Sequence, residues 1–251
     1  MIGVDEVGSK NLFLKRFEVK YLLNQEQYNA FMKKTEGKFL KDKYFESNIS
    51  NIYFDTPDFL LIRRSIDKPV VYKEKLRLRT YTTPDDTTKA YCEIKKKYKG
   101  VVYKRRVGMN YSTAFDYLKR QGPPKKECQI SKEIDWMFKI YEGLAPAMYI
   151  SYDRQSYTSA DDDELRLTFD RNITWRSDGL DQRLGSYGNK LLPDDVVLME
   201  LKIPGAMPVW FAKILDELQI YPASFSKYGN SYRIMMGHEP TYGAFLKKTN
   251  A

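Results

Sequence analysis

The sequence predicts an α+β fold in which an antiparallel sheet closes into a barrel and helices cover its outer surface. Segments with strand periodicity carry apolar side chains at alternate positions, with Arg, Lys or Glu between them. Amphipathic segments separate these strands, and their apolar faces need a surface to cover. If the charged faces meet inside a barrel, the sheet loses its edges and the helices bury its apolar outer face.

The strand predicted over 72–81, YKEKLRLRTY, shows this pattern most clearly. Its leucines share one face, and the other face carries Lys73, Lys75, Arg77 and Arg79. Neighbouring cations about 5 Å apart repel by roughly 3 kcal/mol per pair at an effective dielectric constant near 20. A chain of phosphates would compensate them, and we expect the lysine pKa values to be lowered without it and restored when it binds. The other interpretation is an edge strand whose charges prevent aggregation.

The remaining elements follow from alternation, capping and turn signals. Asn24 and Gln27 match a capping box that begins a helix ending near Gly37. Further helices are expected after Ser112, after Ser131 and from Pro208. Turns are expected at 56–58, 83–86, 99–100 and 159–163, and 176–195 is left unassigned. Strands are expected over 12–22, 50–55, 59–66, 91–97, 101–109, 148–158, 165–173 and 196–203.

Length and composition limit the classes of function. The 251 residues contain no internal repeat or Pro-rich linker, which predicts one domain over 1–251 with a core from about 12 to 236. The net charge of +9 indicates a polyanionic partner, such as nucleic acid, an anionic membrane surface, nucleotides or polyphosphate. The two cysteines form no disulfide framework or thiolate metal site. With one histidine, a metal site would use carboxylates, which suit Mg²⁺ or Mn²⁺.

Targeting signals are not evident. The N-terminal segment has no apolar core of a signal peptide, and no apolar run reaches the length that spans a membrane. A soluble, cytoplasmic protein is therefore expected, and the oligomeric state stays open.

An ordered set of motifs carries a family resemblance. KYLL follows a strand-borne Glu, and then come YFDTPD, YKEKLRLRTY, CEIKKK, VYKRR, YDRQSY, RLTFD, LMELK and SFSKYGNS. Over about 13–232 this set resembles the polyphosphate-polymerase domain of the vacuolar transporter chaperone (VTC) family. That family belongs to the triphosphate tunnel metalloenzymes, so the resemblance implies an eight-stranded antiparallel barrel. Hydrolytic relatives begin with ExExK, whereas Arg16, Glu18 and Lys20 give RxExK here, which favours the polymerase branch.

The resemblance also implies roles for individual residues. Glu200 would hold the divalent metal, Mn²⁺ or Mg²⁺, while Glu18 and Glu93 are either further ligands or ion-pair partners. Arg63 or its neighbour Arg64 would face the tunnel. Catalytic roles fall to Lys20, Arg77, Arg79, Arg154 and Arg166, and phosphate binding to Arg63, Lys95, Lys104, Tyr152, Ser226 and Lys227. Strand parity adds Lys75, Lys97 and Arg106 to the phosphate-binding set.

The implied activity is transfer of the γ-phosphate of ATP to a growing polyphosphate chain. Two alternatives remain open at this stage. The same fold with water as acceptor would be an inorganic or nucleoside triphosphatase. The other alternative is a module that binds polyphosphate or RNA without catalysis. RNA is included because aromatic residues make up 14% of the chain, and bases can stack on them. Cations enclosed in a barrel leave little room for bases, so ATP and polyphosphate are the expected partners and nucleic acid is not.

Overall fold

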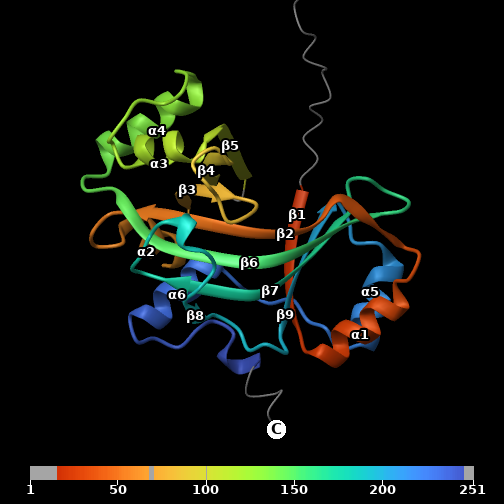
Figure 1. Ribbon diagram of the computed structural model, residues 1–251. Coiled ribbons are helices and arrows are strands. Elements are labelled where there is room, and N and C mark those ends of the chain that lie inside the picture. Colours follow the sequence, from red (N-terminus) through yellow and green to blue (C-terminus); the bar gives the residue numbers. More distant parts are fainter. Residues whose placement is uncertain (1–15, 68–70, 100, 246–251) are drawn as a thin grey trace, which may run out of the picture.

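The computed structural model describes residues 16–67, 71–99 and 101–245, and Figure 1 shows how they are arranged. A nine-stranded sheet with antiparallel pairing runs in the order β1-β9-β7-β6-β2-β3-β4-β5, with β8 paired to β7. The strands are β1 (Arg16–Leu23), β2 (Phe39–Asp55), β3 (Tyr72–Thr80), β4 (Lys89–Tyr98), β5 (Val101–Asn110), β6 (Ala145–Ser159), β7 (Arg166–Arg176), β8 (Asn189–Lys190) and β9 (Val197–Pro204). The helices are α1 (Gln25–Lys34), α2 (Leu60–Ile66), α3 (Tyr111–Leu118), α4 (Gln129–Ile140), α5 (Val209–Glu217), α6 (Lys227–Met235) and the short 3₁₀ helix η1 (Gln182–Leu184).

The predicted α+β class is confirmed, but the closed barrel is wrong. Strands β1 and β5 end the sheet, and within the described residues they do not pair with each other. Between β1 and β3 lies the start of α6 instead. Lys20 Nζ on β1 donates to the Phe225 carbonyl at 3.1 Å, and Lys75 Nζ on β3 lies 3.5 Å from Ser226 Oγ. Side-chain contacts to this segment therefore connect β1 with β3, whereas a closed barrel would pair the backbones of β1 and β5.

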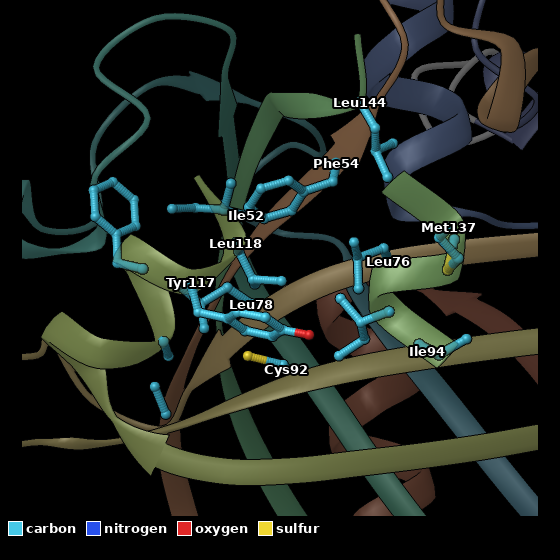
Figure 2. Close-up of a cluster of buried hydrophobic side chains, with 14 of the residues drawn as sticks. Ile52, Phe54, Leu76, Leu78, Cys92, Ile94, Tyr117, Leu118, Met137 and Leu144 are labelled. Carbon is cyan, nitrogen blue, oxygen red and sulfur yellow. The ribbon is translucent and has the colours of Figure 1, made fainter. Parts of the chain in front are cut away.

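Helices cover the apolar face of the sheet at both of its ends, as predicted. At one end α3 and α4 pack on β3 and β4, where Figure 2 shows strand side chains directed toward Tyr117, Leu118 and Met137. Cys92 lies in this cluster and is fully buried, so it faces the covering helices. At the other end α1 and α5 cover β7 and β9, and Phe31 and Phe211 meet there at 5.6 Å between ring centroids.

Two expectations about local structure are wrong. Residues 59–66 form helix α2 in place of a strand, because the buried Asp55 carboxylate accepts backbone N–H groups of Leu61 and Ile62 at 2.8 and 3.0 Å. These bonds satisfy donors that every helix start leaves unpaired. Strand β2 is also much longer than the 50–55 expected, because it begins at Phe39. Residues 12–15, Gly100 and the side chain of Arg16 lie outside the described residues.

The unassigned segment 176–195 is organised by a buried cation. Arg176 is 2% exposed and donates hydrogen bonds to the backbone carbonyls of Gly179, Asp181, Gly185 and Tyr187. Its guanidinium lies 3.5 Å from the centroid of the Tyr149 ring. The charge is thus satisfied without a carboxylate, and the loop that contains η1 and β8 folds around it.

Across residues 16–67, 71–99 and 101–245, none of the helices combines the length and the apolar character that crossing a bilayer requires.

Candidate functional site

Cationic and acidic side chains share one face of the sheet, which we call the charged face. Strand register arranges part of it in three rows across β6, β7, β9 and β1. Residues paired in register point to the same side of a sheet. The inner row is Arg154, Asp170, Leu198 and Leu22; the middle row is Ser156, Thr168, Glu200 and Lys20; and the outer row is Thr158, Arg166, Lys202 and Glu18.

A first cluster of ion pairs surrounds two carboxylates, Asp170 and Glu200. Arg154 binds both Asp170 oxygens at 2.6 and 2.7 Å and reaches Glu200 Oε2 at 2.9 Å. Lys227, from the start of α6, also contacts both carboxylates, at 2.5 Å from Asp170 and 3.3 Å from Glu200. Lys20 completes the cluster at 3.3 Å from Glu200. Asp170 is fully buried and Glu200 is 7% exposed, so these pairs are screened little by solvent.

The charges of this cluster shift each other's protonation. Burial alone would raise the pKa of Glu200, but Lys227, Lys20 and Arg154 hold it well below its usual range. Burial would likewise lower the pKa of Lys227, and the Asp170 and Glu200 carboxylates raise it instead. The cluster therefore keeps Glu200 ionised and Lys227 protonated at neutral pH.

A second cluster surrounds Glu93 on β4. Its Oε2 accepts two hydrogen bonds from the Arg77 guanidinium at 2.6 and 2.8 Å, and Lys104 lies 2.9 Å from Oε1. Arg79 lies 3.8 Å from the same carboxylate. Burial raises the pKa of Glu93, but these three cations outweigh it and lower the pKa to about 2.

Arg79 and Tyr152 join the two clusters. The Arg79 guanidinium donates to Asn51 at 2.8 Å and to the Tyr152 hydroxyl at 3.3 Å. The Tyr152 ring lies 5.2 Å from the Arg154 guanidinium and 4.3 Å from Lys227 Nζ. Burial raises the pKa of Tyr152, and these three cations lower it overall. Tyr152 is thus a hydrogen-bonding part of the charged face and not only a packing residue.

Five lysines on the charged face have no acidic partner. Among the described residues no carboxylate lies within 4.0 Å of the ammonium groups of Lys73, Lys75, Lys95, Lys97 and Lys202. Burial, together with the nearby cations Lys73, Lys95 and Lys20, lowers the pKa of Lys75 to about 7. Burial and neighbouring lysines also lower the pKa of Lys73. Burial and Arg154 lower the pKa of Lys202, although Glu18 and Glu200 act to raise it. Lys20 on β1 thus acts on Lys75 on β3, so these two strands lie near each other across the charged face.

Three of the predicted site arginines lie outside the two clusters: Arg63 and Arg106, predicted to bind phosphate, and Arg166, predicted to be catalytic. Arg63 is on α2, where it pairs with Asp58, and its neighbour Arg64 is exposed. Arg106 is exposed on β5, 4.6 Å from the Tyr91 ring. Arg166 is exposed in the outer row, and its Nε lies 3.4 Å from the Asp163 carbonyl.

Asp170, Lys73 and Lys202 belong to this face but were not among the predicted site residues. Parity could have found all three, since Lys73 and Lys202 stand two positions, and Asp170 four positions, from a predicted residue on the same strand. Asp170 in particular holds Arg154 and Lys227, which come from β6 and α6. The contact between Asp170 and Arg154 follows from the register of β6 and β7, which the sequence alone does not give.

The acidic residues fit a divalent metal that arrives with phosphate. Nowhere in the described part of the chain do three His, Cys, Asp or Glu side chains gather into a cage for an ion. Glu200 and Glu18 lie on adjacent strands, and both contact Lys20 Nζ, at 3.3 and 3.6 Å. Mg²⁺ commonly takes one or two carboxylates and completes its shell with phosphate oxygens and water. Glu93 fits this role less well, because it is only 1% exposed and the Arg77 guanidinium binds one of its oxygens with two hydrogen bonds.

Comparisons with known proteins agree with this fold. A candidate adenylate cyclase from Bacillus halodurans is 15% identical, covering 84% of this chain and 95% of its own, with a TM-score of 0.52. A candidate adenylate cyclase from Vibrio parahaemolyticus is 13% identical, covering 84% and 94%, with a TM-score of 0.40. The Mimivirus capping enzyme triphosphatase is 12% identical, covering 82% and 87%, with a TM-score of 0.32. At such identity the first match shows a shared fold alone. The model of the VTC domain matches residues 15–236, and the chain therefore belongs to the VTC domain family.

Proposed function

We propose that the protein transfers the γ-phosphoryl group of ATP to the end of a growing inorganic polyphosphate chain. One observation carries the proposal: five lysines without acidic partners lie on the same sheet face as the ion pairs around Glu200. Those lysines need an anion with many charges, and membership of the VTC family supports a triphosphate as that anion. The cluster around Glu200 then offers the cations and the carboxylate that phosphoryl transfer uses.

The arginines of the two clusters are suited to hold the triphosphate. Arg77, Arg79 and Arg154 are each oriented by a carboxylate or an amide, so their guanidinium groups are held in place before a ligand binds. Each charge-assisted hydrogen bond to a phosphate oxygen contributes roughly 1.5–3 kcal/mol. Preorganised donors of this kind stabilise the charge that develops on the transferred group without a reorganisation cost.

Glu200, with Glu18 beside it, would hold the divalent metal. A bound metal supplies charge neutralisation and polarises the phosphoryl oxygens. Lys20 and Lys227 contact the same carboxylate, so they keep Glu200 ionised and ready to accept the metal.

The acceptor needs no catalytic base in this reaction. The terminal phosphate of polyphosphate is already an anion at neutral pH, so no proton has to be removed before it attacks. The unpaired lysines Lys73, Lys75 and Lys95 would hold this acceptor chain and offset its repulsion from the triphosphate. These residues support phosphoryl transfer by positioning and charge neutralisation.

The test is an incubation of the protein with ATP and Mn²⁺, resolved on a gel that separates polyphosphates by length. Chains that grow with time support the proposal. Release of orthophosphate without chains would indicate a triphosphatase, and ATP binding without turnover would indicate a binding module. Lys139→Ala is the matched control, because it removes one charge from an exposed position on α4 and should leave synthesis unchanged.

A further inference from the structure

The hydroxyl of Thr168 is a buried polar group on the charged face that the ion pairs do not use. Thr168 is 8% exposed, and its Oγ1 has no hydrogen-bond partner among the described residues. Its neighbours along β7, Leu167 and Phe169, lie in the apolar cluster under α1 and α5. Thr168 therefore points the other way, toward the charged face, as its register with Glu200 also requires.

The surroundings of Thr168 favour an anionic ligand. Thr168 stands in the middle row between Ser156 and Glu200, with Arg166 and Lys202 in the outer row beside it. Glu200 is the nearest carboxylate in its row, and Arg154, Lys20 and Lys227 already engage its two oxygens. The described residues leave the hydroxyl without an acceptor, which a bound ligand would supply. An unpaired buried hydroxyl lowers stability, so a retained one calls for an explanation.

We propose that the Thr168 hydroxyl donates a hydrogen bond to a nonbridging phosphate oxygen of the substrate, between the outer-row cations and Glu200. This inference rests on the proposed triphosphate substrate. The long side chains of Arg166 and Lys202 are exposed beside it in the outer row, where they can turn onto the same phosphate when it binds. Thr168 then adds a short, uncharged donor of fixed direction to a set of flexible cations. Such a donor selects the position of one phosphate and adds no repulsion between cations.

Isothermal titration calorimetry with inorganic tripolyphosphate tests the inference in three variants of the full chain. Thr168→Val replaces the hydroxyl with a methyl group of the same shape and should raise the Kd by about tenfold or more. Thr168→Ser keeps the hydroxyl and should bind within about threefold of the wild type. Thermal denaturation should show Thr168→Val to be at least as stable as the wild type, because the variant removes an unpaired buried group.

Thr174→Val is the matched control on the same strand. The Thr174 hydroxyl pairs with Ser151 at 2.7 Å, so this variant should lower the melting temperature and leave the tripolyphosphate Kd unchanged. A wild-type Kd in Thr168→Val, or equal weakening in Thr168→Ser, would overturn the inference, as would a wild-type protein that does not bind tripolyphosphate. The failure of the proposed activity can be told apart from the failure of this inference. If the protein binds tripolyphosphate but makes no chains from ATP, the activity is wrong, and the binding experiment still tests the role of Thr168.

Discussion

Lys75 should take up a proton when a phosphate chain binds. Its ammonium lies on β3 among Lys73, Lys95 and Lys20, and no carboxylate is paired with it. Burial and these cations lower its pKa from 10.5 to about 7. A bound polyanion supplies the missing negative charge and favours the charged form. Binding and protonation are therefore linked, and each should promote the other.

The size of this uptake follows from the lowered pKa. With a pKa of about 7, Lys75 is protonated in roughly one molecule in ten at pH 8. If the bound phosphates restore a pKa near 10, protonation becomes nearly complete, so binding should take up roughly 0.9 proton at this residue. Any proton that the phosphates themselves gain or lose on binding is common to the wild type and to a Lys75 variant, so it cancels in the difference between them.

Titration calorimetry with tripolyphosphate at pH 8, in two buffers of different ionisation enthalpy, measures the uptake. Lys104, whose pKa burial lowers to about 8, contributes to the total, so the difference between variants is the informative quantity. Lys75→Met should take up about 0.9 proton less than the wild type. Lys139→Met, exposed on α4, should match the wild type. Equal uptake in the wild type and Lys75→Met would refute the reasoning.

Three further predictions concern stability and turnover. The pKa of Lys75 is lower in the folded than in the unfolded protein, so its charge destabilises the fold fully below pH 7 and less as the pH rises. Between pH 7 and pH 9 the free energy of unfolding, measured in urea, should therefore increase by about 2 kcal/mol more in the wild type than in Lys75→Met. Asp170→Asn removes the carboxylate that pairs with Arg154 and Lys227 in a buried site, so the free energy of unfolding in urea should fall by about 3–5 kcal/mol. A decrease below about 1 kcal/mol would contradict this pairing. Glu200→Gln should reduce metal-dependent chain synthesis at least about 100-fold while tripolyphosphate still binds, and near-normal synthesis would assign the metal elsewhere.

The sheet face of each strand residue could be predicted because alternation is a local property. Leu76 and Leu78 are fully buried against α3 and α4, while Lys75 and Arg77 lie on the charged face, as parity on β3 requires. The closure of the sheet could not be predicted in this way. Whether β1 meets β5 depends on contacts between distant parts of the chain; the contact between Lys20 and the Phe225 carbonyl, for example, spans 205 residues.

Helix α2 shows a second limit of local patterns. Leu60, Leu61 and Ile62 have side chains that also suit a strand, and only Asp55 decides between the two structures. Its carboxylate is 1% exposed and accepts N–H groups from the first turn of α2 and the hydroxyl of Tyr228 on α6. The hydrogen bond between Tyr228 and Asp55, which are 173 residues apart, thus helps to stabilise this seven-residue helix.

Glu93 and Glu200 explain why the candidate metal ligand needed the structure. Both are strand residues with a lysine two positions later, so the sequence around each predicts the same charged environment. Register separates them. Glu93 lies opposite Arg77 and Arg106, and Arg77 binds it with two hydrogen bonds, which makes it an anchor for that guanidinium. Glu200 lies opposite Thr168 and Lys20, whose ammonium is 3.3 Å away. Arg154 also reaches Glu200, through a single hydrogen bond of 2.9 Å. A metal can displace singly bonded cations more easily than a doubly bonded guanidinium, and this difference supports Glu200 as the proposed metal ligand.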